Sequence, residues 1–261
     1  MRALQIAATG MDAQQTRVEV ISHNIANMST TGYKARRADF ADLHYQQTAS
    51  PGALSSRTGT TLATGVQLGL GVRAASVSIL LEQGSIEKTG QDFDFALEGK
   101  GFFQIEMPSG DVAYTRDGSF KLDGEGTMVT AEGYPLADQI TVPQDARRVS
   151  ANADGEIYAY FDGDPGGQLI GSLTIAGFAN EKGLEAIGDN LFLETGASGA
   201  AIIGEPGQDG LARVRQGYLE QSTVDVVTEI AELIEAQRGY EMNSKVISAS
   251  DQMLGATVQI R

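Results

Sequence analysis

The residues best placed to do chemistry lie in SHNIANMSTTGYKARR, a stretch that begins at Ser22. Its candidate residues are Asn24, Asn27, Gly32, Tyr33 and Lys34. Carboxamides three residues apart share one face of a helix and can bond backbone groups or another helix. A glycine can end the helix, and cations beyond it favour the helix C-terminus or an acidic partner. The stretch is compatible with a catalytic loop, an anion site, a capped helix with a solvated turn, or a joint in an assembly.

Three other patterns give only weak chemical signals. The run Gly69–Ala74 matches G-x-G-x-x-A, but the residues after it alternate like a strand, whereas a dinucleotide site needs a helix there. Asp162 begins a calcium-like pattern in which Gly166 occupies the position of a required ligand. Glu87 with Asp92 and Asp94 could form paired glycosidase carboxylates, although such pairs arise by chance in an acidic chain. We predict no catalytic residue, no metal site and no cofactor.

The composition narrows the function classes further. The 261 residues include 32 Gly, two His, no Cys and no Trp, and the net charge is −15. A chain without Cys has no disulfide or thiolate metal site, and such an acidic chain is a poor ligand for nucleic acid. No stretch approaches the ~20 apolar residues of a membrane span. The short apolar run before Asp12 is not followed by a small-residue cleavage site, so we expect no cleaved signal peptide.

The N-terminal segment has the heptad pattern of a helix. Its two apolar series are Leu4, Met11, Val18 and Ile25, and Ala7, Gln14, Ile21 and Met28. Seven of these eight residues are apolar, with Gly10 as the only strong helix breaker among them. The pattern predicts a helix over 1–30 and favours a coiled-coil-like pairing.

The C-terminal segment, 225–261, has two apolar seams. One consists of Ile230, Leu233, Tyr240, Ile247, Leu254 and Val258, and the other of Met242, Val246, Ala249, Met253, Ala256 and Ile260. A helix with two apolar seams is expected to contact neighbours on more than one side.

The two ends also differ in charge. Residues 1–38 carry five cations and two anions, whereas residues 225–261 carry three cations and six anions. We therefore predict that Lys34, Arg36 or Arg37 meets Asp225 or Glu229, in the same or an adjacent subunit.

The middle of the chain reads as short strands separated by turns. Strands are predicted at Phe102–Glu106, Val112–Thr115, Ser119–Leu122, Thr127–Thr130, Glu156–Phe161 and Leu169–Ala176, with Asp-Gly pairs among the turns. The predicted fold class is α+β: terminal helices packed as a coiled-coil-like pair (1–30 and 225–261), a linker and extended arm (31–75), and an antiparallel β domain (76–224). The arm contains Pro51, Leu54, Leu62, Leu68 and Leu70, which make it too apolar for a purely solvated tether.

Both ends resemble the bacterial flagellar rod and hook protein family. The matching residues are Asn24, Ile25, Ala26, Asn27, Thr31, Gly32, Tyr33 and Lys34, followed near the C-terminus by Gln237, Arg238, Tyr240, Glu241, Asn243 and Lys245. The stretches LEGKGFF and YTRDGSF in the middle also resemble the family. Thr223 stands where the family usually has Asn before the last helix, and Thr is itself a good N-cap.

The resemblance implies a structural protein whose copies stack helically into a rigid, hollow drive shaft that carries torque from motor to hook. Tyr45–Arg73 looks like the arm that sets distal rod members apart from proximal rod and hook members. The implied location is the basal body, where the rod spans the periplasm. The implied partners are further copies of the chain, proximal rod proteins, the hook protein, the P-ring and L-ring proteins and the flagellar type III export apparatus, without nucleic acid or membrane insertion.

The implied assembly residues are those of the helix and turn signatures and the apolar helix seams. Two alternatives stay open. One is a proximal rod or short hook protein of the same family. The other is a secreted carbohydrate-active β protein with helical extensions, in which Glu87 or Asp92 would be needed for turnover.

Overall fold

The computed structural model describes residues 2–49, 64–162, 164–208 and 210–259. Contacts divide the chain into two units. The helical unit comprises Met1–Ala26, Arg36–Ser78 and Asp225–Arg261, and the β unit comprises Asn27–Ala35 and Ile79–Val224. The three-part division drawn from the sequence stays a prediction.

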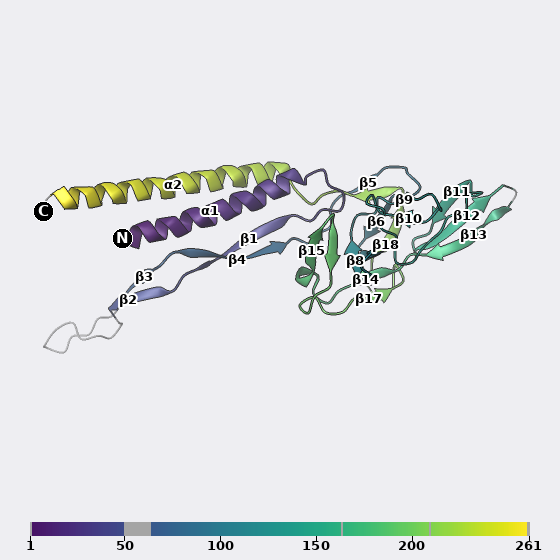
Figure 1. Ribbon diagram of the computed structural model, residues 1–261, viewed down its shortest axis with the longest axis horizontal. Helices are drawn as coiled ribbons and strands as arrows, with labels where there is room; N and C mark the ends of the chain where they lie inside the picture. Colours follow the sequence, from purple (N-terminus) through teal and green to yellow (C-terminus); the bar gives the residue numbers. More distant parts are fainter. Residues whose placement is uncertain (1, 50–63, 163, 209, 260–261) are drawn as a thin grey trace. The chain divides into compact units, whose positions relative to one another are not determined.

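Two long helices form most of the helical unit. Helix α1 (Arg2–Ala26) and helix α2 (Val226–Gln259) lie side by side and run antiparallel (Figure 1). The Asp225 side chain begins α2 by accepting hydrogen bonds from the backbone N–H of Val227 at 3.1 Å and from the hydroxyl of Thr228 at 2.7 Å. Asp225, and not Thr223, therefore caps this helix.

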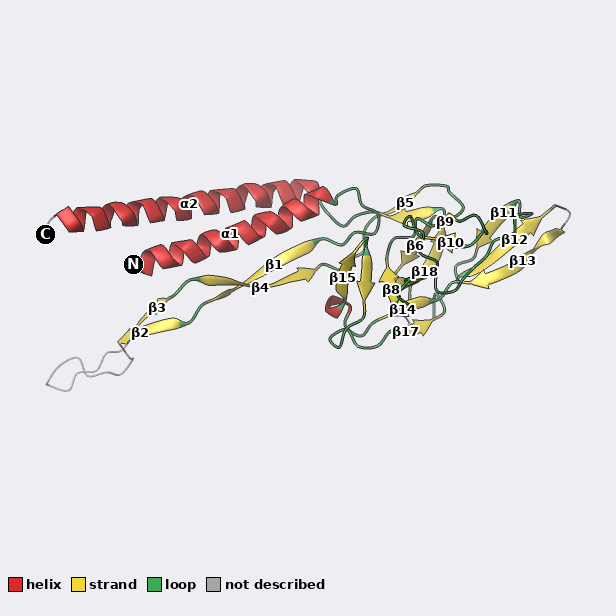
Figure 2. Cartoon of the chain, viewed as in Figure 1, coloured by secondary structure: helices red, strands yellow, loops and turns green. Residues whose placement is uncertain are grey.

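A two-stranded ribbon completes the helical unit (Figure 2). Strand β1 (Arg36–Asp42) pairs with β4 (Val72–Ile79), and β2 (Tyr45–Ala49) pairs with β3 (Val66–Gly69). Gly71 has a φ of +124°, and a Cβ there would lie 2.2 Å from Thr9 Oγ1 on α1. Only glycine permits this approach, so the G-x-G-x-x-A run marks contact between the ribbon and α1. Strand β4 begins inside this run at Val72, so the strand expected from the alternation is present and the helix of a dinucleotide site is not.

The β unit is built from antiparallel strand pairs. Its six-stranded sheet has the order β15-β16-β8-β7-β14-β17, and a three-stranded sheet has the order β11-β12-β13. Smaller pairs are β9 with β10, β6 with β18, and β5 with β19. The bounds are β5 Ile86–Lys88, β6 Phe95–Glu98, β7 Phe102–Glu106, β8 Val112–Thr115, β9 Lys121–Leu122, β10 Met128–Val129, β11 Arg148–Ala151, β12 Glu156–Phe161, β13 Asp164–Ser172, β14 Ile175–Gly177, η1 (a 3₁₀ turn) Glu181–Gly183, β15 Glu185–Gly188, β16 Leu191–Leu193, β17 Ile202–Gly204, β18 Arg213–Gln216 and β19 Tyr218–Glu220.

Aromatic side chains pack against one another within the core of the β unit. In the larger cluster, Phe103 packs edge-on against Phe120 with ring centroids 5.2 Å apart. A second cluster includes Phe102 and Tyr114, each of which packs edge-on against Phe178. Such arrangements add to the apolar area that these rings bury.

The strand predictions can be compared with the structure element by element. Phe102–Glu106, Val112–Thr115 and Glu156–Phe161 are confirmed at their predicted bounds. The single strand predicted over Leu169–Ala176 is wrong, because β13 ends at Ser172 and β14 starts at Ile175. Between them Leu173 turns into the core, and its N–H bonds the carbonyl of Gly155 at 2.8 Å. A continuous apolar pattern does not reveal that turn.

Candidate functional site

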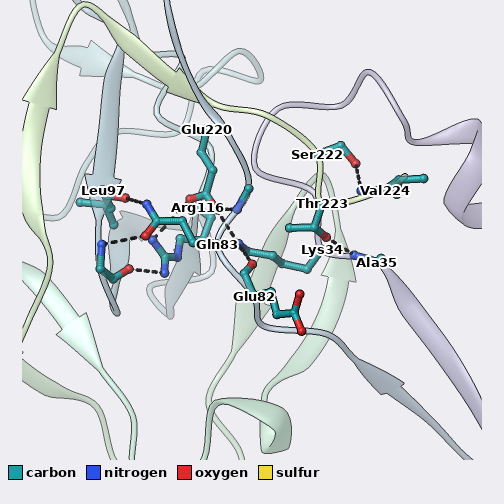
Figure 3. Close-up of polar contacts among 12 residues, drawn as sticks. Lys34, Ala35, Glu82, Gln83, Leu97, Arg116, Glu220, Ser222, Thr223 and Val224 are labelled. Carbon is teal, nitrogen blue, oxygen red and sulfur yellow. Dashed lines mark hydrogen bonds and ion pairs between the residues drawn. The ribbon is translucent and has the colours of Figure 1, made fainter. Parts of the chain in front are cut away.

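A buried cluster of three charges lies in the β unit (Figure 3). Lys34 Nζ donates to Glu220 Oε1, and Arg116 Nη1 donates to Glu220 Oε2 at 3.4 Å. The side chains of Lys34, Arg116 and Glu220 are 1%, 4% and 1% exposed. Two cations thus share a single carboxylate in the interior, and Glu220 provides the compensating charge for both.

Further contacts hold these three charges in place. Lys34 Nζ also donates to the carbonyl of Glu82 at 2.7 Å, and Glu220 Oε1 accepts the N–H of Gly84 at 2.9 Å. Arg116 Nη2 donates to the carbonyl of Gly99 at 2.6 Å. Burial lowers the pKa of Lys34 and of Arg116, and the carboxylate of Glu220 opposes that shift. The arrangement is an electrostatic anchor rather than a reactive centre.

Backbone hydrogen bonds join the two chain segments that carry this anchor. The N–H of Gly32 donates to the carbonyl of Glu220 at 2.8 Å, and the N–H of Thr223 donates to the carbonyl of Tyr33 at 3.1 Å. Thr223 Oγ1 accepts the N–H of Ala35 at 2.8 Å. We call Gly32–Ala35, Arg116 and Glu220–Thr223 the clasp. It ties the segment that follows α1 along the chain to the segment that precedes α2.

Gly32 is sterically required in the clasp. Its φ is +68°, and a Cβ there would lie 2.8 Å from the backbone carbon of Arg116. The left-handed conformation expected of Gly32 is confirmed. Its expected role at the end of the helix is wrong, since α1 ends at Ala26 and Gly32 instead allows close packing on the segment at Arg116.

Asn24 joins three elements of the helical unit. It is 1% exposed, and its Nδ2 donates to the carbonyl of Arg36 at 2.8 Å and to Glu229 Oε1 at 2.9 Å. Its Oδ1 accepts the N–H of Arg36 at 2.9 Å. Burial raises the pKa of Glu229, whereas the bond from Asn24 opposes this shift. Asn24 therefore links α1 to β1 and α2, while Asn27 accepts a local hydrogen bond from Thr30 Oγ1 in the turn after α1.

Within one copy of the chain, two of the three cations predicted to pair with the C-terminal acids have other partners, and the predicted pairing with an adjacent subunit stays a prediction. Lys34 binds Glu220, and Arg37 binds Asp39 on its own strand. The opposite charges of the helices meet instead at Arg17, whose Nη2 lies 3.3 Å from Glu232 and 3.2 Å from Glu235. These carboxylates are partly solvated, so each pair contributes about 0–1 kcal/mol.

Replacement of Asn24 by Ala should destabilise the helix pair by about 1–3 kcal/mol, because it leaves buried groups of Arg36 and Glu229 without partners. The measurement is helix melting by circular dichroism at 222 nm. Asn27→Ala is the matched control, and we expect a change below about 1 kcal/mol since it removes a bond in a turn. Equal effects of the two substitutions would refute the linking role of Asn24.

The predicted residues of α1 divide by burial. Ile21 and Asn24 are buried, Leu4, Met11, Val18 and Ile25 are half-buried, and Met28, beyond the helix end, is 47% exposed. On α2, Leu233, Asn243 and Ile247 are half-buried, whereas Ile230, Gln237, Arg238, Tyr240, Lys245 and Leu254 are exposed. The side chain of Val258 lies outside the described residues. The structure therefore brings part of the predicted set together between α1 and α2.

A second apolar stripe of α2 is exposed. We call Val227, Ile230, Ile234, Met242, Val246 and Met253 the open stripe; their exposed fractions range from 46% to 78%. The open stripe lies beside the α2 residues that contact α1, because Met242 follows Gly239 and Val246 follows Asn243 by three positions, about 60° around the helix. In the arm, Leu68 is exposed and Leu70 half-buried, whereas Pro51, Leu54 and Leu62 lie outside the described residues.

Sequence reasoning missed Arg116 and Glu220 as partners of Lys34. Both lie in stretches that resemble the family, YTRDGSF and QGYLEQSTV. The available signal was Lys34 itself. It directly follows Gly32 and Tyr33, and a buried lysine would need a carboxylate as partner. Nothing in the sequence says which of the many acids supplies it.

The remaining candidates for metal binding or catalysis form no such site among the described residues. Within the ranges that the structure describes, no group of three or more His, Cys, Asp or Glu side chains could hold a metal ion. Glu87 and Asp92 are both exposed. No helix in the described part of the chain is long and apolar enough to cross a membrane.

Comparison with known proteins finds three matched regions in the chain. Residues 4–34 match the model of the flagella basal body rod protein, residues 96–159 the flagellar hook protein FlgE/F/G D1 domain, and residues 215–260 the flagellar basal body rod FlgEFG protein C-terminal model. The chain is 52% identical to the flagellar basal-body rod protein FlgG of Caulobacter vibrioides over the full length of both. It is 47% identical to that of Agrobacterium fabrum over 97% of both, and 37% identical to that of Bacillus subtilis over 100% of this chain and 99% of the relative.

The chain belongs to the FlgG family of flagellar basal-body rod proteins. As a family member it is a structural subunit of the distal rod. The clasp residues Lys34 and Glu220 fall inside the N-terminal and C-terminal family matches, and Arg116 falls inside the match between them. The clasp thus draws one charged residue from each of the three matched regions.

Proposed function

We propose that copies of this chain stack helically into the rigid, hollow distal rod and transmit torque from motor to hook. The open stripe is the observation that carries the proposal. Six large apolar side chains of α2 are exposed beside the residues that contact α1. Apolar surface of this extent on a helix is typical of an interaction site. Helix α2 then has two contacts, one with α1 and one through the open stripe with neighbouring copies in a coiled-coil-like layer.

The ribbon fits the same assembly as a second contact. Its side chains Tyr45, Val66, Leu68 and Val77 are 60%, 52%, 46% and 46% exposed. A two-stranded ribbon is marginally stable in water without further packing. We propose that the arm gains this packing from adjacent subunits and thereby stiffens the rod.

The clasp suits a subunit that carries load. The chain segment at Lys34 follows α1 and the segment at Glu220 precedes α2, and backbone bonds and ion pairs join these segments in the β unit. We propose that this joint lets both helices of one subunit act on its β unit together. The proposed domains are therefore a helical tube (1–30 and 225–261), the arm (31–75) and an outer β domain (76–224).

The proposed partners follow from this role. They are further copies of the chain, proximal rod proteins below, the hook protein above, and the P-ring and L-ring proteins around the rod. We propose export by the flagellar type III apparatus without a cleaved signal peptide, a place in the periplasm-spanning part of the basal body, and no enzymatic activity.

Ile234→Asp tests the polymer. A carboxylate buried without a partner between subunits costs several kcal/mol, and each 1.4 kcal/mol is about tenfold in an equilibrium. We expect the concentration needed for polymerisation to rise at least about tenfold and motility to fall, while the melting temperature of the unassembled chain stays unchanged, since Ile234 is already 46% exposed. Sedimentation and electron microscopy measure the polymer.

Ser244→Asp is the matched control, because Ser244 is exposed on α2 outside the open stripe. It should polymerise like the unaltered chain. Wild-type polymerisation of Ile234→Asp would show that the open stripe is not a subunit contact. Removal of residues 45–73 tests the arm: straight polymers should be lost, whereas retained straight polymers would show that the arm does not stiffen the rod.

A further inference from the structure

Helix α1 covers one face of α2 and leaves the open stripe beside that face exposed. Apolar area alone does not select that side, because the open stripe offers large side chains as well. Burial of apolar surface is also non-directional, so it does not set the position of one helix along the other. Some other contact must distinguish the native pairing from its alternatives.

Two reciprocal contacts between a glycine and a carboxamide occur on the native side. A Cβ added at Gly10 of α1 would lie 2.8 Å from Nδ2 of Asn243 on α2. A Cβ added at Gly239 of α2 would lie 3.1 Å from Cδ of Gln14 on α1. Each helix therefore provides one glycine that makes room for a carboxamide of the other. The spacing is four residues on both helices, so the two contacts form together in one antiparallel register.

The carboxamide of Gln14 is costly as a packing group. Gln14 Oε1 is buried and has no hydrogen-bond partner among the residues that the structure describes. A buried polar atom without a partner destabilises a fold, whereas a Leu at this heptad position would continue the apolar series. Polar residues in the seam of a coiled coil are known to select register and partner at the expense of stability.

We propose that Gln14 and Asn243, each seated on a glycine of the opposite helix, are specificity-determining residues that hold α1 on one side of α2 and in one register. The open stripe has no such pair of glycines facing α1, so docking there would bury both carboxamides against large apolar side chains. The second part of the proposal rests on the proposed function: by fixing α1, the two contacts leave the open stripe available to neighbouring copies.

The test is a distance measurement in the full-length chain at low concentration, where polymerisation does not contribute. The chain has no Cys, so cysteines introduced at the exposed positions Ser22 and Gln237 carry the only spin labels. In the otherwise unaltered chain we expect one narrow distance distribution by pulsed electron paramagnetic resonance. With Gln14→Leu and Asn243→Leu added, we expect a second or broadened population, displaced by about 10 Å for a slip of one heptad, at a melting temperature equal to or above that of the unaltered chain.

Two further variants control this result. Gln15→Leu with Ser244→Leu adds the same two side chains at exposed neighbouring positions and should keep the single distance. Gly10→Leu should lower the melting temperature and shift or broaden the distance, since a side chain of that size takes the space that the Asn243 carboxamide occupies. An unchanged single distance in the Gln14/Asn243 double variant, or an unchanged distance in Gly10→Leu, would overturn the proposal. Because no polymer is present, failure here is separate from failure of the proposed rod function, which the Ile234→Asp polymerisation test reports.

Discussion

Glu220→Gln should lower the free energy of unfolding of the β unit by about 3–5 kcal/mol, because it leaves two buried cations without their carboxylate. Lys34 and Arg116 are at least 96% buried with Glu220, so solvent screens them little. For a domain of this size the change corresponds to a fall of about 6–20 °C in melting temperature. Differential scanning calorimetry of the unassembled chain measures it.

Lys34→Met is the informative comparison. It removes one cation and leaves Arg116 paired with Glu220, a cluster with no net charge, so it should cost clearly less than Glu220→Gln. Adding Lys34→Met to Glu220→Gln should recover part of the loss, since one unpaired cation replaces two. If Glu220→Gln proved no more destabilising than Lys34→Met, Glu220 would not be the compensating charge of the clasp.

Gly32→Val should be the second large effect, at about 2–6 kcal/mol. A β-branched residue at a φ of +68° costs about 1–3 kcal/mol, and its Cβ would also overlap the backbone at Arg116, which adds about 1–3 kcal/mol. Urea unfolding followed by tyrosine fluorescence measures the loss in the β unit. This effect should exceed that of Asn24→Ala.

Gly90→Val separates the two causes. Gly90 has a φ of +74°, and no atom lies within 4 Å of the position that a Cβ would take there, so the backbone strain is present without the overlap. Its cost should be limited to about 1–3 kcal/mol. Equal losses for Gly32→Val and Gly90→Val would mean that the contact at Arg116 contributes nothing.

Much of the secondary structure is determined by local sequence. The heptad series over Leu4–Met28 predicts the helix that the structure has at the N-terminal end of the chain. Alternating apolar residues bounded by turn residues predict strands such as Phe102–Glu106 at their observed bounds. These predictions succeed because helix and strand periodicity are properties of neighbouring residues. The prediction over Leu169–Ala176 fails because a long-range contact of Leu173 decides where the chain turns.

The residues of the N-terminal family signature also show what local sequence determines and what it does not. Their chemical types, including a glycine able to adopt positive φ and a lysine beside it, are visible in the sequence. Lys34 finds its carboxylate 186 residues away, and Asn24 finds Glu229 205 residues away. An ion pair needs a particular position in space, and a chain with 34 acidic residues offers too many sequence partners for that position to be inferred. Tertiary structure alone decides which pairs form.

The two seams of α2 illustrate what each level determines. The sequence by itself shows that α2 has apolar residues on more than one side, because side-chain positions around a helix follow from its 3.6-residue period. Only the tertiary structure decides which side α1 covers and which side remains as the open stripe. The physical reason is that apolar burial is non-directional, whereas the contacts of Gly10 with Asn243 and of Gly239 with Gln14 are short, shape-dependent and specific to one alignment of the two helices.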